Sequence, residues 1–171
     1  MLHVGSEIPE AENELLSNVI ANQNPKTDFK TFGATGPSVL VVDDQRIIAD
    51  TTAEILNKSG FRAVAVYDGK TALRLATEIR PDILLTDVMM PGMNGIDLAI
   101  AVRNDQPGTT ILLFSGQAVT RDLLENARSE GYELELLLKP VHPEELIQRL
   151  KATPNRWARS RGDSRSATCP K

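Results

Sequence analysis

The sequence predicts a doubly wound α/β fold, with helices on both faces of a five-stranded parallel sheet. Two observations predict it. Short apolar runs alternate with helix-like stretches across residues 38–152, and each run precedes its helix. The runs are continuous rather than alternating in polarity, which is typical of parallel strands buried on both faces. Because crossovers between parallel strands are right-handed, five helices are expected to divide between the two faces.

The first two strand–helix units show this order clearly. VLVV (39–42) is the first expected strand, and a helix follows to about residue 59, where Gly60 provides the usual stop. AVAV (63–66) is the second strand. A turn at 68–69 then leads into a helix whose apolar residues share one face.

The remaining three units follow the same pattern. Pro81 ends the preceding helix, and Pro143 lies in the first turn of the last one, where a missing N–H costs nothing. The expected bounds are strand 83–87, then a Pro/Gly loop at 88–95 and a helix to about 105; strand 111–114 with helix 119–130; and strand 134–138 with a helix to about 152.

Both ends of the chain are expected to be appendages of this domain. Residues 1–37 are an N-terminal extension and linker, and apolar residues at helical spacing predict a short helix near 9–21. Residues 153–171 are a basic tail rich in Arg, Ser and Gly, which we expect to be disordered. A tail of this size is too short for a DNA-binding output domain with its own core.

Composition and charge exclude several classes of protein. The net charge is −4 and residues 37–150 are acidic, so phosphate repulsion excludes this part as a nonspecific nucleic-acid binder. No apolar run approaches the roughly 18 residues of a membrane span. The start of the chain has no secretory signal, and the single cysteine, Cys169, forms no internal disulfide. We therefore expect a cytoplasmic protein without membrane contact.

Polar residues follow four of the five expected strands. Asp43 and Asp44 follow the first strand, Asp87 ends the third, Ser115 follows the fourth and Lys139 follows the fifth. The carboxyl ends of parallel strands share one edge, where ligands bind. Three carboxylates there would repel one another unless a cation lies among them, and oxygen ligands suit Mg²⁺. With Lys139 nearby, one carboxylate could attack a phosphoryl group and form an acyl phosphate.

These motifs resemble the receiver domain of two-component response regulators. The matching segments are VLVVDD (39–44), ILLTDVMMPGMNG (83–95), ILLFSG (111–116) and LLLKP (136–140). The resemblance covers residues 38–152 and implies a CheY-like, flavodoxin-like fold with strand order 2-1-3-4-5. It implies a stand-alone receiver domain, because no output domain is expected in the tail.

The resemblance also implies the role of each site residue. Asp87 is expected to be the phosphoacceptor, with Ser115 and Lys139 assisting. Mg²⁺ is the implied cofactor, and its implied ligands are Asp43, Asp44, Asp87 and the backbone carbonyl of Met89. The family's Lys-Pro bond is usually cis, so the same is expected between Lys139 and Pro140.

One position departs from the family pattern. Receiver domains usually carry Tyr, Phe or His three residues before the lysine, and this ring moves inward when the hydroxyl engages the phosphate. Leu136 stands here instead, and Tyr132 lies seven residues before Lys139. The segment between Gly131 and Lys139 is also about one residue longer than the common pattern. The phosphoacceptor site is therefore expected to be complete, while the aromatic relay is not.

The expected function is that of a signalling phosphoacceptor rather than an enzyme. Its implied phosphodonor is a histidine kinase or a histidine phosphotransfer protein, and its output is contact with a downstream protein or relay of the phosphoryl group. A homodimer is left open. Two alternatives also remain open: a degenerate receiver that acts as a constitutive interaction module, and contact of the Arg-rich tail with nucleic acid or an acidic membrane.

Overall fold

The computed structural model describes residues 36–116 and 120–152. The predicted helix near 9–21, nearly all of the predicted linker, and the tail at 153–171 lie outside the described residues. Within them the predicted order of strands and helices is confirmed, and the bounds differ from the predicted ones by at most one residue.

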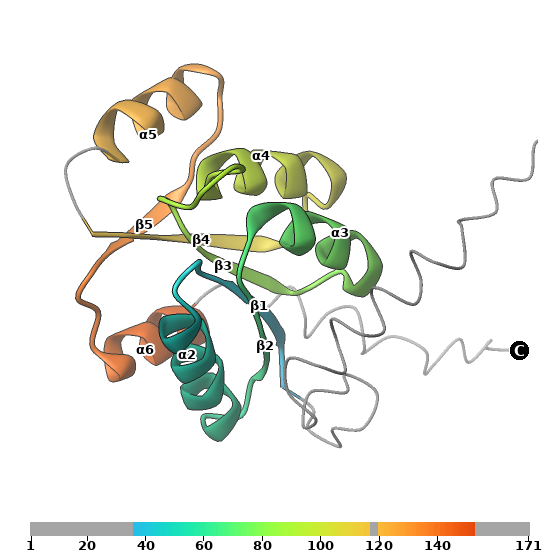
Figure 1. Ribbon diagram of the computed structural model, residues 1–171, viewed down its shortest axis with the longest axis vertical. Helices are drawn as coiled ribbons and strands as arrows, with labels where there is room; N and C mark the ends of the chain where they lie inside the picture. Colours follow the sequence, from blue (N-terminus) through green and yellow to red (C-terminus); the bar gives the residue numbers. More distant parts are fainter. Residues whose placement is uncertain (1–35, 117–119, 153–171) are drawn as a thin grey trace, which may run out of the picture. The chain divides into compact units, whose positions relative to one another are not determined.

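Five strands alternate with five helices along the described part of the chain (Figure 1). Their bounds are β1 (Ser38–Val42), α2 (Arg46–Lys58), β2 (Arg62–Val66), α3 (Gly69–Ile79), β3 (Ile83–Asp87), α4 (Gly95–Asp105), β4 (Thr110–Ser115), α5 (Thr120–Ser129), β5 (Glu135–Leu138) and α6 (Pro143–Ala152). All neighbouring strands are parallel, in the order β2-β1-β3-β4-β5. The predicted doubly wound sheet is therefore confirmed.

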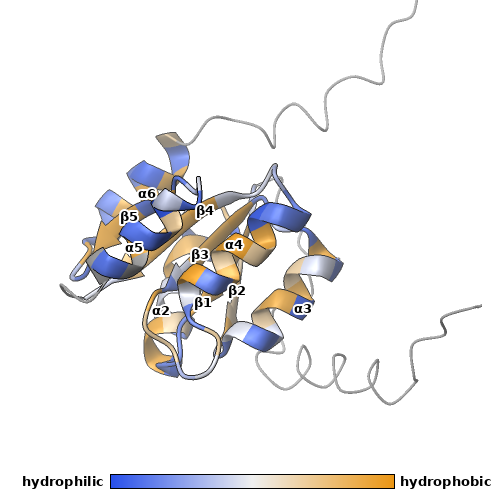
Figure 2. Cartoon of the chain, turned by 90° about the horizontal axis from the view of Figure 1, so that it is seen from above, coloured by the Kyte–Doolittle hydropathy of each residue, from blue (hydrophilic) through white to orange (hydrophobic). Residues whose placement is uncertain are grey.

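Helices cover both faces of the sheet, as Figure 1 shows: α3 and α4 lie on one side, and α2 and α6 on the other. Two clusters of buried apolar side chains correspond to the two faces. The α3/α4 core also takes Ala127 from α5, and the α2/α6 core takes Leu56, Leu146 and Leu150 from its two helices. Figure 2 shows hydrophobic strands between these helices, with hydrophilic stretches on α5 and α6.

The position of each strand in the sheet explains its burial. Every residue of β1 and β3 is buried, because both strands have a neighbour on each side and helices on both faces. The edge strands β2 and β5 are only partly buried. The continuous apolar runs of the sequence therefore mark the centre of the sheet most strongly.

The register of the strands aligns their carboxyl ends. Val42 of β1 lies opposite Val66 and Thr86, and Ser115 of β4 lies opposite Leu138. The residues that follow these strands, including Asp43 and Lys139, consequently lie at the same edge of the sheet.

Two helices begin with a side-chain cap. The Asp68 carboxylate accepts a hydrogen bond from the backbone N–H of Thr71 at 2.8 Å and so caps α3. The Asn94 side-chain oxygen accepts hydrogen bonds from the N–H groups of Ile96 and Asp97, at 2.9 Å each, and caps α4. Both caps hold the loops that surround the carboxyl edge of the sheet.

No helix within residues 36–116 and 120–152 combines the length and apolar character that crossing a membrane requires.

We expect Asp68→Ala to lower the free energy of unfolding by about 1 kcal/mol, because it removes the cap of α3. Asp68→Asn is the matched control, since asparagine caps a helix as well as aspartate does. Urea unfolding followed by circular dichroism measures both variants. Equal stability of Asp68→Ala and the wild type would contradict the capping role.

Candidate functional site

The ammonium group of Lys139 lies between two buried carboxylates at the carboxyl edge of the sheet. Its Nζ donates to Asp43 Oδ2 at 2.8 Å and to Asp87 Oδ1 at 2.5 Å. Asp43 and Asp87 are only 2% and 7% exposed. We call these three residues the Lys139 cluster. The prediction that these residues meet at one edge is confirmed.

Backbone N–H groups hold the other oxygen of each carboxylate. The N–H of Gln45 donates to Asp43 Oδ1 at 2.9 Å, and the N–H of Met89 donates to Asp87 Oδ2 at 2.8 Å. Each carboxylate therefore has one oxygen fixed by its own loop and one that faces a shared cation. This leaves little rotational freedom to either side chain.

Burial and neighbouring charges shift the titration of this cluster. Burial raises the pKa of Asp87, the charge of Asp43 raises it further, and Lys139 and the Met89 N–H act in the opposite direction; the net pKa is raised. Burial lowers the pKa of Lys139, but its hydrogen bonds to Asp43 and Asp87 and their charges outweigh burial, so the net pKa is raised. Lys139 therefore stays charged, and the cluster depends on that charge.

The loop after β3 folds back tightly onto Asp87. The N–H of Val88 donates to the carbonyl of Phe114 at 2.8 Å, and the N–H of Gly95 donates to the carbonyl of Val88 at 3.0 Å. A Cβ atom on Gly95 would lie 1.9 Å from the Asp87 carbonyl oxygen, so only glycine fits. Sequence reasoning assigned Gly95 only to the Pro/Gly loop and missed this contact. Its placement directly after the cap residue Asn94 was the available signal.

Ser115 and Lys139 approach each other through the backbone. The N–H of Lys139 donates to the carbonyl of Ser115 at 2.7 Å, and Ser115 is buried. The peptide bond between Lys139 and Pro140 is cis, which confirms that expectation. The centroid of the Phe114 ring, which sequence reasoning did not single out, lies 5.9 Å from the Lys139 Nζ, within the range of a cation–π contact.

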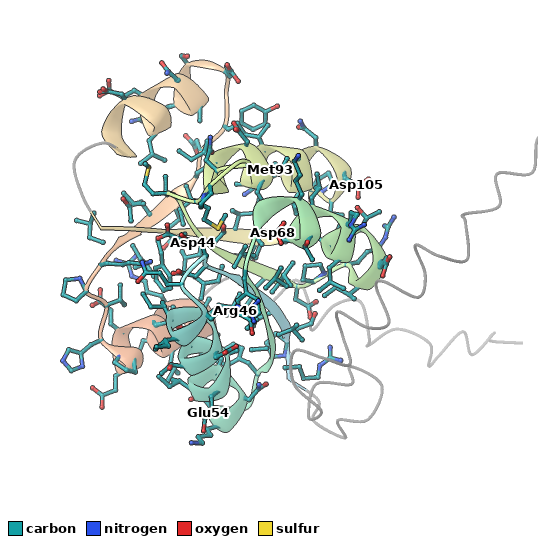
Figure 3. The ribbon with its side chains drawn as sticks, in the orientation of Figure 1. Asp44, Arg46, Glu54, Asp68, Met93 and Asp105 are labelled. Carbon is teal, nitrogen blue, oxygen red and sulfur yellow. The ribbon has the colours of Figure 1, made fainter. Side chains whose placement is uncertain are left out.

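Asp44 and Met89 are placed differently from the other predicted site residues. Asp44, labelled in Figure 3, is exposed where β1 passes into α2. Among the described residues no hydrogen bond or ion pair joins it to the Lys139 cluster, and no group of three or more His, Cys, Asp or Glu side chains is close enough to hold a metal. Met89 reaches Asp87 through its N–H. The predicted convergence of three carboxylates is therefore realised for Asp43 and Asp87 alone.

The donor chemistry of this edge fits a small hard cation. Asp43 and Asp87 already share one cation, the Lys139 ammonium, and both present an oxygen to it. Carboxylate oxygens, together with water, are the ligands that Mg²⁺ prefers. The exposed carboxylate of Asp44 adjoins Asp43 in the chain and adds negative charge at the mouth of the site.

The structure shows the surroundings of Leu136, which stands where the family usually has an aromatic residue, and of the nearby Tyr132. Leu136 is partly buried and packs against the α3/α4 core. Tyr132 packs against the same core, and its hydroxyl lies 3.2 Å from the Asn104 side-chain oxygen near the end of α4, to which it donates. Tyr132 precedes β5, whereas Lys139 follows it. Tyr132 therefore does not take the place of the missing aromatic ring.

Comparison with known proteins identifies the family. A family described as "Response regulator receiver domain" matches residues 39–151. The DNA-binding response regulator MtrA of Mycobacterium tuberculosis is 36% identical over 114 residues, which are 67% of this chain and 49% of MtrA. The transcriptional regulatory protein PrrA of Mycobacterium bovis is 35% identical over 120 residues, which are 70% of this chain and 51% of PrrA. The chain spans about half the length of these curated relatives.

Solved structures agree with this match. The chemotaxis protein CheY4 of Vibrio cholerae superimposes with a TM-score of 0.61 at 29% identity, covering 68% of this chain and 98% of CheY4. The receiver domain of the Francisella response regulator 1452 gives a TM-score of 0.59 at 32% identity, covering 68% of this chain and 94% of that domain.

We expect Gly95→Ala to destabilise the protein by about 1–3 kcal/mol, because the added methyl group meets the Asp87 carbonyl and overpacks the loop. Gly108→Ala is the matched control, since a Cβ there meets nothing within 4 Å. Thermal unfolding of the two variants measures the difference. Similar stabilities for both variants would show that the close approach is not limiting.

We expect Lys139→Met to cost about 2–3 kcal/mol of stability at neutral pH, because it leaves two buried carboxylates without their cation. In this variant the pKa of Asp87 in the folded protein rises further above that of the unfolded chain. The folded state then binds more protons, so the loss grows as the pH rises from about 4 to 7. Lys70→Met, at an exposed lysine of α3, is the control. Urea unfolding at several pH values measures this, and a loss independent of pH would contradict the account.

Proposed function

The chain belongs to the response regulator receiver domain family, and on this premise we propose that it accepts a phosphoryl group on Asp87 from a phosphohistidine. Members of this family are signalling phosphoacceptors in two-component systems rather than enzymes in the usual sense. The observation that carries the proposal is the placement of the Asp87 carboxyl between the Lys139 ammonium and the Met89 N–H.

The side chains of the site fit nucleophilic attack by Asp87. An Asp87 oxygen forms the new bond to phosphorus while the bond to the histidine nitrogen breaks, and the imidazole leaves. The Met89 N–H orients the carboxylate before the reaction. Lys139 offsets negative charge on the incoming phosphoryl oxygens, and Phe114 and the buried strand ends exclude water from that side. Ser115 is the group proposed to hydrogen-bond a phosphoryl oxygen.

We include Mg²⁺ in the proposal as the cofactor of the site. Asp43, Asp87 and the Met89 carbonyl would hold it, and the exposed carboxylate of Asp44 would have to turn inward to join them. When bound, the ion neutralises charge shared by the carboxylates and the phosphoryl oxygens. Asp43 is oriented for this role by the Gln45 N–H, and Lys139 at present occupies the space between Asp43 and Asp87.

Exposed apolar side chains around the site support a protein as the phosphodonor. The large hydrophobic residues that are exposed in the described part of the chain are Ile47, Met89 and Leu138, at 82%, 55% and 67%. Ile47 follows the acidic pair, Met89 follows Asp87, and Leu138 precedes Lys139. We infer that a histidine kinase or a histidine phosphotransfer protein covers them when its histidine approaches Asp87, because each lies within four residues of a member of the Lys139 cluster and burial of apolar surface stabilises a complex.

We propose that phosphorylation changes the conformation of the loops around Asp87. The acyl phosphate carries about 1.5 to 2 negative charges next to Lys139 and Ser115, in place of the single charge of the Asp87 carboxylate. The loop after β3 is tied to Phe114 and Gly95, so a change at Asp87 reaches β4 and α4 directly. Leu136 has no aromatic ring that could move inward when Ser115 engages the phosphoryl group. We therefore propose a switch of these loops without an aromatic relay, read by a downstream protein. The curated relatives are named as DNA-binding or transcriptional regulators, and the matched residues make up about half of each of them.

Incubation with Mg²⁺ and acetyl phosphate is expected to add about 80 Da, one phosphoryl group, to the intact protein. Mass spectrometry of the wild type and of Asp87→Asn measures it, and the adduct is expected to be absent from the variant. Asp68→Asn is the matched control, because it removes a carboxylate from the neighbouring loop and keeps its helix cap.

Two outcomes would contradict this proposal. Absence of the adduct from the wild type would favour the alternative of a receiver that acts as a constitutive interaction module. An adduct that persists in Asp87→Asn would place the phosphoacceptor elsewhere.

A further inference from the structure

A cavity lies at the opposite end of the sheet from Asp87. It has a volume of about 560 Å³ and is lined by Arg103, Arg128, Gly131, Tyr132, Glu133 and Leu134. We call it the arginine cavity. Residues 131–134 precede β5, whereas Lys139 follows it, so the cavity faces the amino ends of the strands. None of Asp43, Asp87 and Lys139 lines it.

The two arginines come from the last turns of two helices. Arg103 lies in the last turn of α4, two residues before Asp105, which Figure 3 labels at the end of this helix. Arg128 lies in the last turn of α5. A helix C-terminus attracts cations, and this accounts for basic residues at both positions. It does not account for the burial of the Arg103 Nε atom.

The guanidinium of Arg103 contains a buried donor without an acceptor, whereas Arg128 is exposed to solvent. The Arg103 Nε is buried without a hydrogen-bond partner, and it is the one such side-chain atom in the described part of the chain. Among residues 36–116 and 120–152, neither Arg103 nor Arg128 takes part in an ion pair, although Glu133 lines the same cavity. Buried donors in folded proteins are nearly always satisfied, so an unpaired one indicates a missing acceptor.

A second hollow adjoins the arginine cavity. It measures about 250 Å³, and Arg103 and Glu133 line both. Arg103 and Glu133 therefore lie where the two hollows meet. The larger cavity falls within the range of about 300–1,000 Å³ that is usual for small-molecule sites.

We propose that the arginine cavity binds a small organic phosphate. The phosphoryl oxygens accept hydrogen bonds from the guanidinium groups of Arg103 and Arg128, whose planar donors match phosphate geometry. The organic body lies against Tyr132 and Leu134, and Glu133 accepts a hydrogen bond from a hydroxyl or amino group of that body. A concave site with an apolar wall favours a small molecule over an acidic protein surface. This inference goes beyond the phosphoacceptor role and does not depend on it.

Nuclear magnetic resonance titration of the full chain tests the proposal. The probes are inorganic phosphate, adenosine monophosphate, glucose 6-phosphate and uncharged adenosine. We expect an organic phosphate to shift the backbone amide signals of Arg103 and of residues 128–134 in a saturable way, more tightly than inorganic phosphate, while adenosine does not.

Substitutions assign the effect to the two arginines. Arg103→Gln and Arg128→Gln are each expected to weaken binding by about tenfold or more, as loss of a charge-assisted hydrogen bond requires. Arg74→Gln is the matched control, because Arg74 is an exposed arginine of α3 that lines neither cavity. Asp87→Asn is expected to bind as the wild type does, which separates this site from the phosphoacceptor. Amide spectra establish that each variant is folded.

Several results would overturn the proposal. They are absence of saturable shifts with both organic phosphates, affinity for adenosine equal to that for adenosine monophosphate, and affinity for inorganic phosphate equal to that for the organic phosphates. Unchanged affinity in folded Arg103→Gln and Arg128→Gln, or loss of affinity in Arg74→Gln, would also overturn it.

Discussion

The site depends on a single ammonium group shared by two buried carboxylates. Asp43 and Asp87 come from different strands and would repel each other if Lys139 did not lie between them. Because backbone N–H groups fix the remaining oxygens, the repulsion is not relieved by rotation of either side chain. The geometry of this edge of the sheet is therefore fixed by the Lys139 ammonium together with the two backbone N–H groups.

The fold provides this arrangement through register. Parallel pairing aligns the ends of β1, β3, β4 and β5, so short loops bring polar side chains to one place without distorting the strands. The loop after β3 adds a second constraint, since it closes on Asp87 at Gly95 with no room for a side chain. The start of α4 is thus in direct backbone contact with Asp87. The arginine cavity lies at the other end of the same layer, where the C-terminal ends of α4 and α5 approach the segment before β5.

Much of this could be predicted from the sequence. Continuous apolar runs located the strands, and the polar residues that follow them located the edge that carries Asp43, Asp87 and Lys139. Contacts between side chains could not be predicted in the same way. Strand periodicity says that Asp44 follows a strand, but not that it is turned outward into solvent while Asp43 is buried. The role of Phe114 and the unpaired state of Arg103 arise from segments distant in the chain and have no local signal, and the only local sign of the Gly95 contact was its position after Asn94.

The most direct test of the central claim is calorimetric titration of Mg²⁺ into the wild type, Asp43→Asn and Asp87→Asn. Glu78→Gln, at an exposed carboxylate of α3, is the control for loss of one negative charge. The account predicts saturable binding to the wild type and to Glu78→Gln, and loss of binding when either Asp43 or Asp87 is neutralised. Equal binding by all four proteins would contradict it.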